Sequence, residues 1–149
     1  VPRLWEPLAS KHNPSNGYAA KFSLPYLLAV MLVKGRATLA EFTDEAARDR
    51  AVLEVAGKVG YELDPTIDYP RQFIGHVAIR LHDGRLLEER QDHPRGGPDF
   101  PMTREEVEAK FRGNASLAVP DGQVARVIGI VGELAAQPHV TALMDSLTA

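Results

Sequence analysis

One short segment of the chain places side chains that could do chemistry next to the start of a helix. The segment is Lys21-Phe22-Ser23-Leu24-Pro25-Tyr26, and an apolar run follows it. The first N–H groups of a helix lack partners within the helix and its dipole is positive there, so an anion is favoured at this end. Lys21 would add a positive charge, and the phenol of Tyr26 could donate a hydrogen bond or a proton.

The same three residues also fit a purely structural interpretation. Ser23 would cap the helix through its hydroxyl, Lys21 would be a solvated side chain, and Tyr26 would be a buried aromatic residue. Both interpretations are open at this point, because the spacing alone is compatible with each.

Other kinds of active site find less support. The five histidines are scattered without the His-x-x-x-His spacing of a helical metal site, and the chain has no cysteine. It also has no Gly-x-Ser-x-Gly motif for a serine nucleophile. Arg95-Gly96-Gly97 could meet an anion but lacks the pattern of a P-loop, and a stiff turn before a helix is the alternative. We therefore expect no metal site.

The segments around Lys21–Tyr26 are predicted to be mostly helical. Residues 1–17 contain three prolines and indicate a loop or a broken strand. Residues 19–33 predict one long helix, residues 38–42 a short helical turn, and residues 44–58 a helix capped by Thr43. Because one side of the long helix is so apolar, we expect this helix to be buried; that side carries Leu24, Leu27, Leu28, Met31 and Leu32.

The second half of the chain predicts β-structure followed by helices. Alternation in residues 59–63 predicts a strand, and residues 73–82 and 85–92 predict a hairpin. Its loop, Asp83-Gly84, would need positive φ at both residues. Thr103 and Glu106 predict a capping box for a helix that ends near Arg112, and two more helices are predicted over 121–136 and 140–147.

The predicted fold class is α+β in one domain over residues 1–149. It consists of a small antiparallel sheet of about three strands packed with several α-helices. A length of 149 residues with 44% hydrophobic and 25% charged residues is typical of one globular domain.

Charge and hydropathy exclude some partners. A net charge of -3 argues against a nucleic-acid partner bound through a broad basic surface. The longest nearly apolar run, Leu24 to Val33, is far shorter than the roughly 20 residues of a membrane-spanning helix. The lack of cysteine is compatible with a reducing compartment. We expect a cytoplasmic protein without nucleic-acid or membrane partners.

Two blocks of the sequence together resemble the MmgE/PrpD family. The first is Gly17-Tyr18-Ala19-Ala20-Lys21-Phe22-Ser23-Leu24-Pro25-Tyr26. The second runs from Arg95-Gly96-Gly97-Pro98 through Pro101-Met102-Thr103 to Lys110-Phe111 and Asn114-Ala115. That family includes 2-methylcitrate dehydratase, cis-aconitate decarboxylase and iminodisuccinate epimerase. The resemblance is confined to its C-terminal α+β domain, often called the lid, and the large N-terminal helical domain has no counterpart in this chain.

The resemblance implies a part of a cofactor-independent lyase or isomerase that acts on small di- or tricarboxylic acids. Such enzymes are usually homodimers, and 2-methylcitrate dehydratases of propionate catabolism are among them. Tyr26 matches the tyrosine that the lid contributes to the active-site cleft, and Lys21 and Ser23 match the motif as further candidates for catalytic residues. Many relatives have glutamate where this chain has Ala19, so a carboxylate that could pair with Lys21 is missing.

Two functional hypotheses follow. In the first, the chain is the lid of an MmgE/PrpD-type enzyme, forms a wall of the cleft and is inactive by itself. In the second, it is a stand-alone binding or interaction module derived from that domain. A lid without its large domain should expose an uncovered apolar patch, and a genuine module should not.

Overall fold

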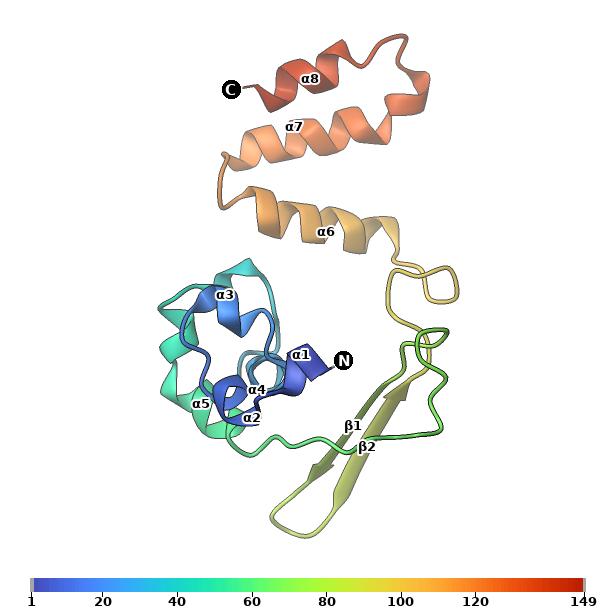
Figure 1. The fold of residues 1–149 in the computed structure, drawn as a ribbon. Helices are drawn as coiled ribbons and strands as arrows, with labels where there is room; N and C mark the ends of the chain where they lie inside the picture. Colours follow the sequence, from blue (N-terminus) through green and yellow to red (C-terminus); the bar gives the residue numbers. More distant parts are fainter. Residues whose placement is uncertain (1, 149) are drawn as a thin grey trace. The chain divides into compact units, whose positions relative to one another are not determined.

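The computed structural model describes residues 2–148 and has the predicted α+β fold (Figure 1). Its only sheet within these residues has two antiparallel strands rather than about three. The elements in chain order are α1 (Pro2–Trp5), α2 (Leu8–His12), α3 (Gly17–Ala20), α4 (Leu24–Lys34), η1 (Leu39–Phe42), η2 (Ala46–Arg48), α5 (Arg50–Ala56), β1 (Gly75–Arg80), β2 (Leu86–Gln91), α6 (Arg104–Ala115), α7 (Asp121–Gly132), η3 (Leu134–Ala136) and α8 (Thr141–Leu147), where η marks a 3-10 helix.

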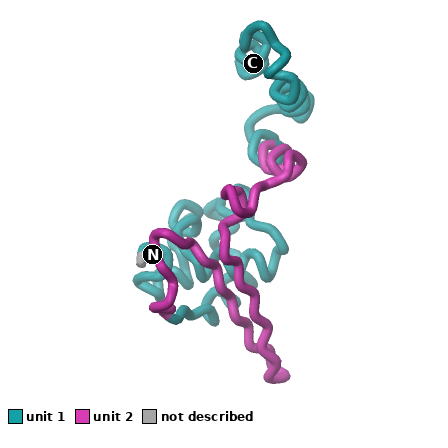
Figure 2. Tube along the Cα trace, turned by 90° about the vertical axis from the view of Figure 1, so that its right-hand side faces the viewer, with its two compact units in different colours: residues 1–62, 112–149 teal, residues 63–111 magenta. Residues whose placement is uncertain are grey.

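The chain divides into two compact units, which Figure 2 shows in different colours. Unit 1 comprises residues 1–62 and 112–149, and unit 2 comprises residues 63–111.

The core of unit 1 forms where α4 packs against α5. On α4 the inward residues are Tyr26, Ala29 and Val30, whose spacing of three and four places them on one side of the helix. The small side chains of this core let the backbones approach closely. Its buried members are Ala20, Tyr26, Ala29, Val30, Ala47, Val52 and Ala56.

The prediction of two long helices is wrong, because each is divided at a residue whose side-chain oxygen caps the start of a second helix. The prediction over residues 19–33 is divided into α3 and α4 at Ser23, whose hydroxyl accepts the N–H of Tyr26. The prediction over residues 44–58 is divided into η2 and α5 at Asp49, whose carboxylate accepts the N–H groups of Ala51 and Val52. Such caps satisfy N–H groups that a continuous helix would bond internally.

The predictions for residues 1–17 and for residues 59–63 are also wrong. Residues 1–17, predicted as a loop or broken strand, contain α1, α2 and the start of α3, and residues 59–63 do not form a strand. The two segments contact each other instead. The Val59 carbonyl bonds with the His12 ring, and Trp5 packs on Tyr61 with ring centroids 5.0 Å apart.

Unit 2 contains the predicted hairpin, in a shorter form and with a different loop. Strands β1 and β2 pair in register from Gly75 with Gln91 to Arg80 with Leu86. The Leu81 N–H bonds to the Arg85 carbonyl, and the Gly84 N–H bonds to the Leu81 carbonyl. The loop is therefore a turn followed by Gly84 at φ 88, and Asp83 keeps a negative φ, contrary to the prediction.

The C-terminal helices begin and pair through local contacts. Thr103 and Glu106 form the predicted capping box at the start of α6. Helices α7 and α8 pack on each other, with Val124 and Val127 buried on α7. Within residues 2–148, no helix is both long enough and apolar enough to cross a membrane.

Candidate functional site

The Gly17–Tyr26 block begins with a glycine that lies directly against another part of the backbone. A Cβ at Gly17 would be 2.2 Å from the Phe42 carbonyl oxygen, so only glycine allows this approach. The Gly17 N–H also donates to the Asp44 carboxylate at 2.8 Å. These contacts fix the start of the block against the segment that follows η1.

Ser23 holds the middle of the block through two hydrogen bonds. Its hydroxyl accepts the N–H of Tyr26 at 3.0 Å and donates to the Lys11 carbonyl at 2.5 Å. The Lys11 ammonium donates in turn to the Phe22 carbonyl at 2.7 Å. Ser23 is buried and is the N-cap of α4, as the structural interpretation expects.

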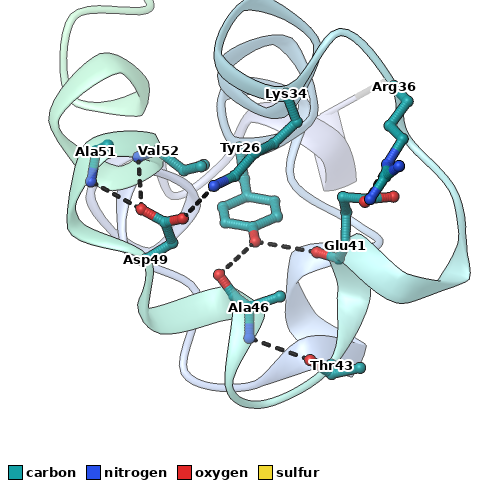
Figure 3. Close-up of polar contacts among 9 residues, drawn as sticks. All are labelled: Tyr26, Lys34, Arg36, Glu41, Thr43, Ala46, Asp49, Ala51 and Val52. Atoms are coloured by element: carbon teal, nitrogen blue, oxygen red, sulfur yellow. Dashed lines mark hydrogen bonds and ion pairs between the residues drawn. The ribbon is translucent and has the colours of Figure 1, made fainter.

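Tyr26 lies in the core of unit 1, with 1% of its surface exposed. Its hydroxyl is 2.8 Å from the Ala46 carbonyl oxygen and 3.1 Å from that of Glu41, as Figure 3 shows. Burial raises the pKa of the phenol, and the charges of Asp49 and Glu41 raise it further. The phenol is therefore neutral, and its O–H donates hydrogen bonds to backbone carbonyls of the turns between α4 and α5.

Glu41 is a buried carboxylate beside this tyrosine that the sequence analysis did not single out. It accepts hydrogen bonds from the Arg36 guanidinium at 2.8 Å and from the Thr38 N–H and hydroxyl at 2.8 and 2.7 Å. Burial alone would raise its pKa, but these donors outweigh burial and hold the pKa at about 2. The signal in the sequence was the Thr38–Glu41 spacing, which is that of a capping box.

Asp49 links the two core helices. It caps α5, and its carboxylate is 2.6 Å from the ammonium of Lys34 in the last turn of α4 (Figure 3). The hydrogen bond from Lys34 lowers the pKa of Asp49, and the N–H groups of Val52 and Ala51 lower it as well. The carboxylate therefore stays charged near Tyr26 at neutral pH.

The exposed members of the block are Tyr18, Lys21 and Phe22. Tyr18 and Phe22 pack on each other, with ring centroids 5.2 Å apart. Lys21, Ser23 and Tyr26 therefore do not converge on one point within the described residues. Lys21 reaches solvent, whereas the functional groups of Ser23 and Tyr26 are used in internal hydrogen bonds. The catalytic role of these three residues stays a prediction.

The second block lies in unit 2 as far as Phe111, and its Arg95-Gly96-Gly97 segment forms the stiff turn of the alternative interpretation. Arg95 donates to the Pro101 carbonyl at 2.6 Å and pairs with Glu106, and its guanidinium lies 4.2 Å from the centre of the Phe100 ring. The bond from Arg95 and the N–H of Thr103 hold the pKa of Glu106 at about 2. The Arg95 side chain is thus engaged in contacts that hold the loop in front of α6.

Neither a metal-binding cluster nor the hollow between α7 and α8 coincides with the two blocks in the described residues. Within residues 2–148, no three histidine, aspartate or glutamate side chains gather in a way that could hold a metal ion. An open hollow of about 400 Å³ lies between α7 and α8 and contains no residue of either block. It is lined by Gly122, Gln123, Arg126, Asp145, Ser146 and Thr148.

Comparison with known proteins places the two blocks in a family. The model of the MmgE/PrpD C-terminal domain matches residues 5–136, which include both blocks. The chain belongs to the MmgE/PrpD family.

Curated relatives of this family member are named cis-aconitate decarboxylases. The protein of Mus musculus is 30% identical in an alignment of 124 residues that covers 81% of this chain and 25% of the relative. The human protein is 30% identical in an alignment of 123 residues that also covers 81% of this chain and 25% of the relative. That of Aspergillus terreus (strain NIH 2624 / FGSC A1156) is 27% identical in an alignment of 141 residues that covers 92% of this chain and 29% of the relative. The MmgE/PrpD segment described here thus spans between a quarter and a third of the length of these relatives.

Proposed function

We propose that this chain is the C-terminal domain of an MmgE/PrpD-type lyase or isomerase that acts on small di- or tricarboxylic acids. The observation that carries the proposal is the family match over residues 5–136. The relatives named cis-aconitate decarboxylases favour cis-aconitate as the substrate to test first, and 2-methylcitrate remains the second. The complete enzyme would need no cofactor and would form a homo-oligomer, as the family resemblance implies.

The proposed chemistry is proton transfer next to a carboxylate, followed by loss of carbon dioxide or water or by reprotonation. It requires a substrate held by cationic and backbone donors and a base and acid at fixed positions. This domain would supply one wall of the cleft. Lys21 is the block's exposed cation and could bind a substrate carboxylate.

Tyr26 is the proposed acid or hydrogen-bond donor, and its environment sets a condition for that role. The raised pKa keeps the phenol protonated, as a donor requires. To contact substrate in the complete enzyme, the phenol must break its hydrogen bond to the Ala46 carbonyl and form one to the substrate instead. Ser23 would act indirectly, because its hydroxyl fixes the start of α4.

The competing proposal is a stand-alone binding module. Many large apolar residues of the chain are exposed, among them Leu27, Met31 and Leu32 on α4 and Met144 and Leu147 on α8. A monomeric module rarely leaves so much apolar surface to water. The exposure favours a domain that is covered by a larger enzyme.

The experiment is turnover of cis-aconitate and 2-methylcitrate by the complete gene product with Tyr26→Phe, beside Tyr18→Phe as the control at an exposed tyrosine. A catalytic phenol predicts that kcat falls by about 100-fold or more for Tyr26→Phe at equal folded fraction, and stays unchanged for Tyr18→Phe. A Tyr26→Phe enzyme that is less stable but has parental kcat would overturn the catalytic role. A parent inactive on small carboxylic acids would overturn the proposed function.

A further inference from the structure

Helix α4 has an apolar side that the core of unit 1 does not use. Leu27, Met31 and Leu32 are 36%, 46% and 56% exposed, and Leu28 between them is half-buried. Their spacing of three and four places them on one side of the helix, opposite the buried residues Tyr26, Ala29 and Val30. We name Leu27, Leu28, Met31 and Leu32 the outer face of α4.

The composition of α4 shows that both of its sides are suited to burial. Its only charged residue is Lys34, which lies in the last turn and is paired with Asp49. A helix that is apolar all round is normally enclosed in a larger protein. With Leu27, Met31 and Leu32 in water, α4 has the packing of a surface helix and the sequence of an interior one.

We propose that the outer face of α4 binds an apolar surface in the part of the MmgE/PrpD polypeptide that lies outside this chain. The inference rests on the proposed function. Its support is that the mouse and Aspergillus relatives match this chain over only 25% and 29% of their own length, so most of each relative lies outside the match. Because the outer face has no charged residue, the surface that covers it must also be apolar opposite Leu28 and Met31.

The test introduces one thiol at a time into the 149 residues of this chain, which contain no cysteine. Met31→Cys places the thiol on the outer face, and Glu54→Cys places it on the exposed side of α5 as the matched control. Each variant reacts with a maleimide in the 149-residue chain and in the complete gene product, and peptide mass spectrometry gives both rates. Leu27→Cys repeats the measurement in case Met31→Cys perturbs folding.

The expected result has three parts. In the complete gene product, the thiol at position 31 reacts about tenfold more slowly than the thiol at position 54. In the 149-residue chain the two thiols react at similar rates. The protection at position 31 does not change when the protein is diluted.

Three results would overturn the inference. Equal rates at positions 31 and 54 in the complete gene product would mean that nothing covers the outer face. Protection already present in the dilute 149-residue chain would mean that its own segments cover the face. Protection that is lost on dilution would identify a second copy as the occupant.

Turnover of cis-aconitate by the parent separates this inference from the proposed function. Activity together with an unprotected thiol at position 31 would refute the inference and leave the function standing. Protection without turnover of any small carboxylic acid would do the reverse.

Discussion

Replacing Gly17 by alanine is expected to destabilise unit 1 strongly. The added Cβ would lie 2.2 Å from the Phe42 carbonyl oxygen and 2.7 Å from the Thr43 carbonyl carbon, whereas ordinary contacts begin at 3.4 Å. The atoms that must move belong to the backbone, so no side-chain rotation relieves the contact. Any shift also strains the hydrogen bond from the Gly17 N–H to Asp44.

The magnitude follows from these two contacts. Overpacking of a closely packed site costs about 1–3 kcal/mol, and a weakened bond to a carboxylate costs about 1–2 kcal/mol more. We expect the free energy of unfolding to fall by about 3 kcal/mol, which lowers a urea midpoint by about 1–3 M. That is a large fraction of the stability of a small domain.

The assay is urea unfolding followed by the fluorescence of Trp5, the only tryptophan of the chain. Gly57→Ala is the matched control, because Gly57 has φ -62 at the end of α5 and its Cβ would make only ordinary contacts, the nearest at 3.5 Å. This control should be neutral or stabilise by about 0.5 kcal/mol. A parental midpoint for Gly17→Ala, or an equal loss for Gly57→Ala, would refute the reasoning.

Three further predictions concern the caps and the hairpin. Ser23→Ala should lower the free energy of unfolding by about 1–2 kcal/mol in the same assay, because it removes the cap of α4 and the hydrogen bond to the Lys11 carbonyl. Ser15→Ala, at an exposed position, should leave the free energy of unfolding unchanged, and equal urea midpoints for the two variants would contradict the role of the cap. The pKa of Glu41 is lowered from 4.5 to about 2 in the folded state, so its contribution to stability is complete above pH 5 and is lost as the pH falls toward 2. The difference in free energy of unfolding between the parent and Glu41→Gln, measured by urea unfolding, should therefore decrease as the pH falls from 5 toward 2. A difference that does not change with pH would show that the charge of the Glu41 carboxylate does not stabilise the fold. Gly84→Ala should destabilise the hairpin by about 1 kcal/mol, because φ 88 is unfavourable for alanine. The backbone amides of β1 and β2 should then exchange faster in Gly84→Ala than in the control variant His82→Ala, and equal exchange rates would contradict the observed turn.

The features predicted correctly from the sequence depend on residues that are close together in it. Thr103 and Glu106 are three positions apart, and the hairpin needs only Asp83-Gly84 between two alternating segments. The capping and turn chemistry acts within a few residues, so the sequence pattern shows it directly. The detailed turn type was wrong because both a two-residue and a three-residue loop can use this pair.

The features that the sequence did not reveal depend on contacts between distant segments. The close approach of Gly17 to Phe42 joins residues about 25 positions apart, and the hydroxyl of Tyr26 bonds to the carbonyl of Ala46, 20 positions away. Neither contact leaves a periodic pattern. The expectation for α4 was wrong, because the apolar side predicted from the spacing carries Leu27 and Met31, which are exposed, whereas Ala29 and Val30 on the other side face the core. Since α4 is apolar on every side, periodicity does not distinguish its two sides.

The candidate site was predicted as a block of residues but not as a geometry. The resemblance singled out Lys21, Ser23 and Tyr26, and the family match confirms the family in which this block occurs. Burial separates the three, because Ser23 and Tyr26 use their hydroxyls inside unit 1 and Lys21 is exposed. The catalytic role of each residue stays a prediction.

The most direct test of the account is the mass of the gene product in its native host, measured by detecting a peptide of this region after separation by size. If the chain is the C-terminal domain of a two-domain enzyme, the peptide should come from a product about three times heavier than 16.3 kDa or more, since the matched segments are 25% and 29% of the relatives. A product of 16.3 kDa itself would contradict this account and identify the chain as a stand-alone protein.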